Sequence, residues 1–340
     1  MNASFGLGTE FVLPPSRYNF IARLLGAKAR LAALPAEVSR LSAKLDSILV
    51  YLQSTGGSDH PALPAPDLLG LFASEDRGLW EREFRRQIFN APMSAERLLC
   101  RVLGRYKMMV SAADDGLAPH LVGEGYWEVW ITRFICRSVK PGMVCIDAGA
   151  NVGYYTLLMA DMCGPNGRVI AAEPVPATRE LLFTNIRLNG FSERVEIRPE
   201  AFGDTHAEVT MATPRGEPKN ALVMQDGAGL LPGWQWDKLT VPMIRIDDLQ
   251  LPRVDFVKID VEGAEEALWR GMSQTLDRSP DIQIVMEVSY YRYPDPEAFF
   301  ADIARRFPLR WVDYAGKAAP ITLDEIRNTP GDVMLYLSRN

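Results

Sequence analysis

From about residue 140 onward, short apolar runs alternate with segments whose apolar residues recur every three or four positions. Short apolar runs are typical of buried strands, and the longer spacing is typical of helices that bury one face. The runs predict strands at residues 144–147, 169–173, 195–198, 256–260 and 282–288. The segments between and after them predict helices at residues 154–162, 177–188, 264–272 and 296–307.

This alternation predicts an α/β fold: a doubly wound, mostly parallel, Rossmann-like sheet with helices on both faces. Residues 309–313 and 333–337 are expected to close the sheet as a terminal hairpin. No internal repeat is evident in the sequence.

The N-terminal segment has a different pattern. Apolar residues from Leu31 to Leu52 are spaced alternately by three and four positions, which is the a/d seam of a short coiled coil. Residues 1–53 are therefore predicted to be helical, and the seam could hold subunits together in a homo-oligomer. The alternative is one amphipathic helix packed on its own domain, and Pro35 must start or kink that helix.

Three further regions follow this segment. Glycine, serine and proline crowd residues 54–66, and we assign a linker to residues 54–73. Residues 74–124 are expected to form a lead-in or cap that begins with one helix over residues 74–90, with acidic residues early and basic residues late. Residues 125–340 then form the main domain.

Composition narrows the function. Lys and Arg total 37 against 43 Asp and Glu, so no global basic field attracts nucleic acid. The four cysteines show no CxxC pairing and are expected to be buried and reduced. No apolar stretch approaches the roughly 18–20 residues of a transmembrane helix, and no signal peptide is evident. These features predict a cytoplasmic protein.

The first predicted strand runs directly into a glycine-punctuated turn. Asp147 stands at the strand end, and Gly149 and Gly153 follow it. A phosphate cradle would offer backbone N–H groups and a lysine, whereas a carboxylate here would repel a pyrophosphate. The second strand ends in Glu173, which suits a ribose diol. Together the two strand ends suit S-adenosylmethionine, which carries an ammonium, a sulfonium and a ribose.

The fourth predicted strand ends in a second charged motif. Asp260 stands at its carboxyl end, where open α/β sheets bind ligands, and it is the first candidate for a general base or acceptor-orienting group. Glu262 is the second candidate. Lys258 could pair with a carboxylate or stabilise the charge that develops in the transition state. The structural alternative is an ion pair at Lys258, with Glu262 and Glu265 starting the next helix.

Two further features are left open. Asp260, Glu262 and Glu287 could instead hold a divalent ion, because clustered carboxylates suit hard cations, but we assign no metal. Aromatic residues that could stack on an acceptor fall into two groups: Tyr290, Tyr291 and Tyr293 beside Arg292, and Trp234 with Trp236.

The two motifs, residues 146–156 and 258–265, together resemble the FkbM family of S-adenosylmethionine-dependent methyltransferases. Supporting stretches are Gly125 to Glu128, Asn185 and Asn189 in the second predicted helix, and Ile246 to Leu249 before the fourth strand. The resemblance runs from about Gly125 to the C-terminus and leaves out the coiled-coil segment and the linker.

The resemblance implies the class I methyltransferase fold and, most often, O-methylation in glycan or secondary-metabolite pathways. It implies that four residues surround the methionine part of the cofactor: Asp147, Gly149, Asn151 and Gly153. It also implies that Glu173 accepts hydrogen bonds from the ribose, and that Glu200 and Ala201 border the adenine. The acceptor would be a saccharide or another small molecule.

Two other functions compete with this hypothesis. One is a non-catalytic module that retains the fold as a cofactor-binding or scaffold protein in a glycan-assembly complex, since fold alone does not guarantee activity. The other is an NAD-dependent oxidoreductase. The first turn disfavours it, because the turn lacks the G-x-G-x-x-G spacing of dinucleotide-binding domains.

Overall fold

The computed structural model describes residues 64–216, 221–224 and 235–340. The chain divides into two compact units, Met1–Ala65 and Pro66–Asn340, and the second is described below. The predicted coiled coil lies outside the described residues, so self-association through it stays a prediction. Among the described residues, no helix combines the length and apolar character needed to cross a bilayer.

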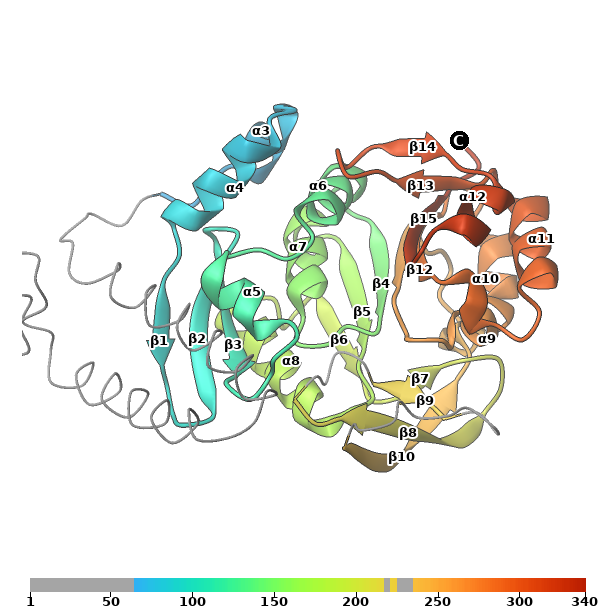
Figure 1. Ribbon diagram of the computed structural model, residues 1–340, viewed down its shortest axis with the longest axis horizontal. Helices are drawn as coiled ribbons and strands as arrows, with labels where there is room; N and C mark the ends of the chain where they lie inside the picture. Colours follow the sequence, from blue (N-terminus) through green and yellow to red (C-terminus); the bar gives the residue numbers. More distant parts are fainter. Residues whose placement is uncertain (1–63, 217–220, 225–234) are drawn as a thin grey trace, which may run out of the picture. The chain divides into compact units, whose positions relative to one another are not determined.

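An eight-stranded sheet forms the centre of the second unit, with the order β14-β13-β15-β12-β11-β4-β5-β6 (Figure 1). Five neighbouring strands are parallel and lie where the apolar runs predict them: β12 (Gln283–Val288), β11 (Phe256–Ile259), β4 (Val144–Ala148), β5 (Arg168–Ala172) and β6 (Val195–Arg198). The fold is therefore the doubly wound, mostly parallel sheet that the sequence predicts.

Successive residues of each central strand enter opposite hydrophobic cores. Cys145 and Val169 pack in the core that contains α6 (Val129–Ser138), α7 (Tyr154–Met162) and α8 (Pro176–Leu188). Ile146 and Ile170 pack in the core that contains α9 (Glu265–Arg270), α10 (Ser273–Arg278) and α11 (Pro296–Arg306). Because side chains alternate along a strand, burial on both faces requires the continuous apolar runs seen in the sequence.

At the far edge of the sheet, the structure differs from the predicted terminal hairpin. Strands β13 (Arg310–Val312) and β15 (Val333–Leu337) do pair antiparallel, but β14 (Ala318–Pro320) and α12 (Leu323–Asn328) lie between them in the chain. The true hairpin joins β13 to β14. Its turn closes through hydrogen bonds from Asp313 N to Lys317 O and from Gly316 N to Asp313 O, where Gly316 has a φ of +67°.

The lead-in region contains the helix predicted within residues 74–90, shortened at both ends, and a further helix precedes it. Helix α3 (Leu68–Ala73) occupies the end of the predicted linker, and α4 (Arg77–Arg86) begins separately. The reason is Asp76, whose side chain accepts a hydrogen bond from Leu79 N and caps a new helix start. The rest of the region forms an antiparallel sheet of β1 (Asn90–Pro92), β2 (Arg97–Val102) and β3 (Tyr106–Ser111), followed by the short helix α5 (Ala118–Gly123).

Two asparagines attach this small sheet to helix α8. Asn185 Oδ1 accepts from Met109 N at 2.6 Å, and its Nδ2 donates to Met109 O at 3.0 Å. Asn189, one turn later, makes the same pair of hydrogen bonds with Lys107 at 3.0 and 2.7 Å. β3 is an edge strand of its sheet, and the two side-chain amides hydrogen-bond to its backbone as a neighbouring strand would.

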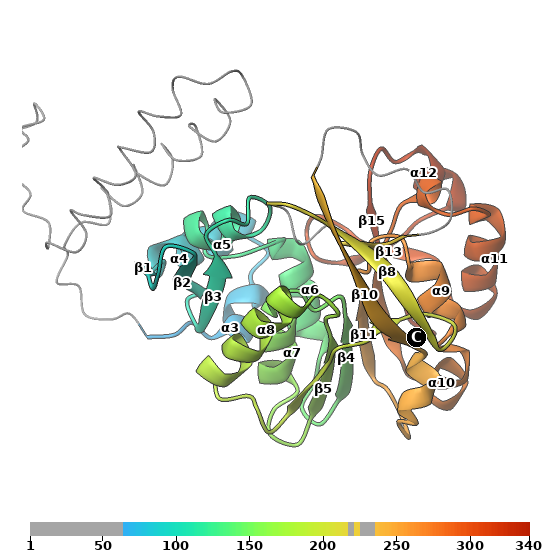
Figure 2. The same cartoon turned by 90° about the horizontal axis from the view of Figure 1, so that it is seen from below.

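A second small sheet lies between β6 and β11 in the chain. Its order is β7-β10-β8-β9, formed by β7 (Ala201–Phe202), β8 (Ala207–Pro214), β9 (Leu222–Val223) and β10 (Trp236–Ile244). Figure 2 shows β8 and β10 as long neighbouring strands. The sequence analysis did not predict this sheet.

All four cysteines are buried and free of disulfides, as predicted.

Candidate functional site

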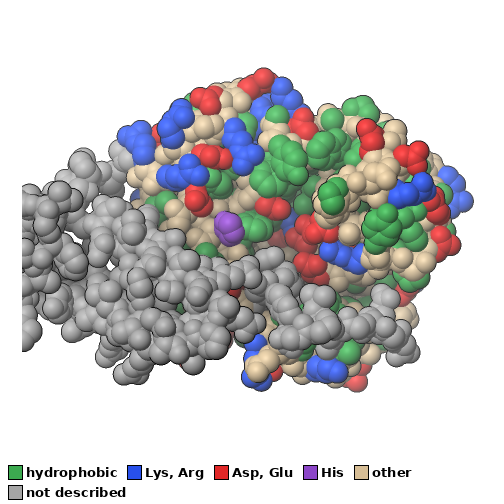
Figure 3. Space-filling view, viewed as in Figure 1, with side chains coloured by type: hydrophobic (Ala, Val, Ile, Leu, Met, Phe, Trp, Pro, Cys, Tyr) green, Lys and Arg blue, Asp and Glu red, His purple; other side chains and the backbone are tan. Residues whose placement is uncertain are grey.

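A cavity of about 590 Å³ opens at the carboxyl ends of β4, β5 and β11. Ligands of open α/β sheets bind at this edge. The loop after β4, the residue after β5 and the charged motif of β11 all line it. Figure 3 shows acidic side chains gathered in a hollow near the middle of this face, beside a group of hydrophobic side chains.

The loop after β4 is bound tightly to its neighbours. Gly149 N and Ala150 N both donate to the carbonyl of Ala172, at 3.1 and 2.9 Å. Gly149 has a φ of +79°, and a Cβ on it would overlap the carbonyl oxygen of Asp260. Only glycine fits this position without a shift of the backbone. The loop therefore presents its backbone to the cavity at a fixed place.

Glu173 is the buried carboxylate of the site. Its Oε2 accepts from Asn151 N at 2.9 Å and its Oε1 from Val175 N at 2.8 Å. Burial raises the pKa of Glu173 to about 7, although both backbone hydrogen bonds oppose the shift. Each carboxylate oxygen retains a further lone pair for a ligand hydroxyl. Glu173 thus both anchors the first loop and faces the cavity.

Asp147 and Gly153 lie behind the wall of the cavity rather than in it. Asp147 is 1% exposed, and its Oδ2 accepts from Thr156 Oγ1 at 2.5 Å. Burial raises the pKa of this carboxyl. A Cβ on Gly153 would come within 2.6 Å of Leu182 Cδ1, so this glycine serves close packing of α7 against α8. Neither residue lines the cavity, and the place beside the methionine part of the cofactor that the resemblance implies for them stays a prediction.

Lys258, which is buried, and Asp260, which is partly exposed, form an ion pair at the end of β11. Lys258 Nζ lies 2.8 Å from Asp260 Oδ2 and 4.8 Å from the centre of the Tyr155 ring. Burial favours the neutral amine, but the carboxylates of Asp260 and Asp147 outweigh it and raise the pKa of Lys258 above its usual value. Lys258 stays charged and holds the Asp260 carboxylate in place.

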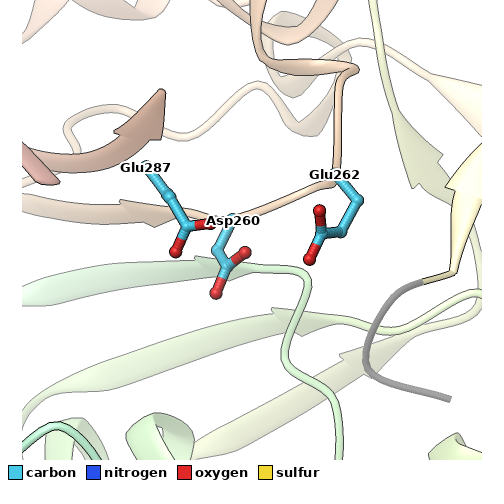
Figure 4. Close-up of side chains that lie close together, drawn as sticks. All are labelled: Asp260, Glu262 and Glu287. Carbon is cyan, nitrogen blue, oxygen red and sulfur yellow. The ribbon is translucent and has the colours of Figure 1, made fainter. Parts of the chain in front are cut away.

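Three carboxyl groups converge beside this ion pair. One oxygen each from Asp260, Glu262 and Glu287 lies within 4.8 Å of the other two. Figure 4 shows the carboxyl groups of Asp260 and Glu287 side by side, with that of Glu262 turned toward them. Burial, followed by repulsion from Asp260, raises the pKa of Glu287 well above its usual value. Glu287 therefore carries a proton near neutral pH and can donate a hydrogen bond.

Neighbouring groups complete this cluster. Arg292 Nη2 lies 3.5 Å from Glu262 Oε2 and 2.9 Å from Asp332 Oδ1. Tyr155 donates to Glu128 Oε2 at 2.7 Å. The carboxylate spacing would also suit one divalent cation, the alternative that the sequence analysis left open.

The charged residues among the described residues that line the cavity are predominantly acidic. Seven are carboxylic acids, against two cations, Lys258 and Arg292. The seven are Glu128, Glu173, Glu200, Asp260, Glu262, Glu287 and Asp332. A cavity of this charge favours a cationic ligand and disfavours a pyrophosphate, as the first turn suggested.

Most of the residues predicted from the sequence do meet in this cavity. Its lining includes Gly149, Asn151, Glu173, Glu200 and Ala201 of the proposed cofactor residues, and Lys258, Asp260 and Glu262 of the proposed catalytic residues. Arg198 holds the Glu200 carboxylate through two hydrogen bonds, at 3.0 and 3.1 Å.

The sequence analysis did not predict three contributors: Glu128, Tyr155 and Asp332. Glu128 and Tyr155 lie within stretches that it quoted but to which it gave no individual role, whereas no sequence motif pointed to Asp332. The aromatic run after β12 is mainly a packing element. Tyr290 stacks on Phe300, and Tyr293 packs against Phe299. Of the other aromatic group, Trp236 lines the cavity and Trp234 lies outside the described residues.

Comparison with known proteins agrees with this geometry. Residues 147–315 match the family described as the Methyltransferase FkbM domain. The chain thus contains an FkbM-family methyltransferase domain, which includes the loop after β4, Glu173 and the Lys258 motif.

Individual relatives match over shorter stretches. Methyltransferase 1 of Beauveria bassiana is 28% identical over 165 residues, which are 43% of this chain and 65% of the relative. A protein-L-isoaspartate O-methyltransferase of Aeropyrum pernix is 31% identical over 33% of this chain and 42% of the relative. The chain thus spans less than two thirds of the length of these curated relatives.

Among solved structures, Methyltransferase FkbM from Methylobacillus flagellatus KT aligns with a TM-score of 0.38 and 15% identity. The alignment covers 59% of this chain and 44% of that one.

Proposed function

We propose that this protein transfers a methyl group from S-adenosylmethionine to a hydroxyl oxygen of a saccharide or a secondary metabolite. The observation that carries the proposal is that one acidic cavity joins the Gly149 loop, Glu173 and the Lys258–Asp260 pair. These three parts come from the ends of adjacent parallel strands, and they lie within the matched methyltransferase domain.

The residues present fit S-adenosylmethionine. The Gly149–Asn151 backbone would lie beside the methionine part, and the surrounding carboxylates would balance the ammonium and sulfonium charges. The Glu173 carboxylate would accept hydrogen bonds from the ribose hydroxyls. Glu200 and Ala201 would border the adenine together with Phe202, which also lines the cavity.

When bound, the cofactor supplies a methyl carbon whose transfer to the acceptor oxygen breaks the carbon–sulfur bond and leaves the electron pair on sulfur. Asp260 accepts the proton that the acceptor hydroxyl loses. Lys258 fixes the orientation of that carboxylate, and the protonated Glu287 donates a hydrogen bond to the acceptor or to Asp260. Positioning of this kind contributes up to roughly 7–11 kcal/mol when alignment is ideal.

A mass-spectrometric acceptor screen tests the proposal. The protein is incubated with S-adenosylmethionine and a panel of glycans and hydroxylated metabolites, and an acceptor is expected to gain 14 Da. Cofactor binding without transfer to any acceptor would favour the scaffold alternative. A protein that binds NAD and not S-adenosylmethionine would contradict the proposal.

A further inference from the structure

A second cavity, of about 580 Å³, adjoins the first. Three acids belong to the linings of both cavities: Glu128, Glu287 and Asp332. Glu287 is also one of the three acids that converge with Asp260. A molecule bound in the second cavity can therefore contact the charged cluster while a cofactor occupies the first cavity beside the Gly149 loop and Glu173.

Aromatic rings form one wall of this second cavity. Trp130 of α6, Trp311 of β13 and Tyr314 of the turn after β13 all line it. The Tyr314 ring lies 5.3 Å from that of Trp130 and 5.9 Å from that of Trp311, edge to face in both cases. Tyr314 is 65% exposed, so its ring is not a core element. Such rings offer flat apolar faces to a ligand while their polar edges stay hydrated.

The charge of the second cavity restricts the ligand further. Its acidic residues are Glu128, Glu287, Glu325 and Asp332, and no Lys, Arg or His is among the described residues that line it. Arg77 lies over the Trp130 ring at 5.3 Å but is not part of the lining. Phosphate, sulfate and carboxylate groups would be repelled here. A ligand without anionic groups, whose hydroxyls donate to the carboxylates and accept from the protonated Glu287, fits this lining.

We infer that the second cavity is the acceptor subsite, and that it takes a neutral sugar ring of a saccharide. The aromatic wall would contact the face of the ring, and one hydroxyl would extend past Glu287 to Asp260. This inference rests on the proposed methyl transfer, and it selects neutral saccharides among the acceptors named there.

Binding of the protein to saccharides immobilised on an array tests the inference. The protein, saturated with S-adenosylhomocysteine, is applied to an array of neutral, uronic, sialylated and phosphorylated oligosaccharides. Tyr314→Ala removes an exposed ring of the aromatic wall, and Tyr314→Phe retains the ring. Tyr291→Ala is the matched control, because Tyr291 is 78% exposed and lines neither cavity. Calorimetry with S-adenosylhomocysteine is run on every variant.

We expect the wild type to bind neutral saccharides and Tyr314→Ala to bind them about fivefold to tenfold more weakly. Tyr314→Phe and Tyr291→Ala should bind as the wild type does, and all variants should bind S-adenosylhomocysteine equally. The inference is overturned if only acidic saccharides bind, or if Tyr314→Ala binds saccharides as the wild type does. It is also overturned if the protein binds S-adenosylhomocysteine but no saccharide. A folded protein that fails to bind S-adenosylhomocysteine would instead overturn the proposed function on which the inference rests.

Discussion

The carbonyl oxygen of Asp260 lies directly against the α-carbon of Gly149, so closely that no side chain fits between them. The amide of Asp260 also donates to Ala148 O at 3.1 Å, just before that glycine. The two motifs are more than a hundred residues apart in the chain. This contact couples the position of the proposed cofactor loop to the position of the proposed base.

Gly149→Ala should therefore disturb both halves of the site. We expect it to weaken S-adenosylmethionine binding by at least about tenfold, because the loop must move away from Asp260, and to cost about 1–3 kcal/mol of stability from backbone strain alone. Gly142→Ala is the matched control. Its φ is +83° against +79° for Gly149, but a Cβ there meets nothing within 4 Å. Calorimetry measures cofactor affinity and urea unfolding measures stability for both variants. Together they separate the cost of a positive φ, which both variants share, from the steric overlap with Asp260, which only Gly149→Ala has. Equal cofactor affinity of the two variants would contradict this account of the contact.

Glu173 should make cofactor binding depend on pH. Ribose hydroxyls donate to the carboxylate form, so affinity should rise as pH increases through about 7, the pKa of Glu173. The same shift acts on stability: the folded protein binds the extra proton, so this contribution is present below about 4.5 and is lost as pH rises through about 7. Glu173→Gln should bind the cofactor more weakly and with no pH dependence of this origin. A titration series from pH 5.5 to 8.5 measures both, and parallel pH profiles for the two proteins would contradict the assignment.

Asp260→Asn should separate turnover from binding. We expect kcat to fall by about 10²–10⁴-fold, the usual contribution of a general base, while cofactor affinity stays unchanged. Single-turnover rates with an acceptor found in the screen check this expectation. A variant with normal kcat would remove Asp260 from the chemistry.

Lys258→Met should lower stability, in addition to releasing the Asp260 carboxylate from its fixed orientation. Lys258 is 2% exposed and faces the carboxylates of Asp260 and Asp147. Its loss leaves buried negative charge unpaired, which typically costs about 3–5 kcal/mol. Urea unfolding measures the change. A loss below about 1 kcal/mol, the range of exposed ion pairs, would show that the pair is solvated.

The central sheet could be predicted from the sequence because its strands are buried on both faces. Cys145 and Ile146 enter different cores, so the strand is apolar at every position and stands out from its surroundings. The β7–β10 sheet is exposed at many positions, as in β10, where buried residues are rare. Its strands therefore lack the continuous apolar runs that reveal the strands of the central sheet. The helix expected over residues 74–90 is present but shortened to Arg77–Arg86, because the local cap at Asp76 starts it there.

The same limit applies to the site. Asp147 and Glu173 both stand at strand ends, and the sequence alone does not distinguish them. Asp147 lies within β4 and pairs in register with Lys258, so its side chain points to the same face of the sheet as Lys258 and contacts Thr156. Glu173 comes one residue after β5 ends, where the chain turns, and it reaches the cavity. The side that a carboxylate faces depends on register, which spacing in the sequence does not reveal.

Calorimetric titration with S-adenosylmethionine, with NAD as the control ligand and Glu173→Gln as the site variant, tests the central claim most directly. We expect saturable binding of S-adenosylmethionine, weaker binding by Glu173→Gln, and no binding of NAD. Absence of S-adenosylmethionine binding to the folded wild-type protein, or equal affinity of the wild type and Glu173→Gln, would contradict the assignment of this cavity as the cofactor site.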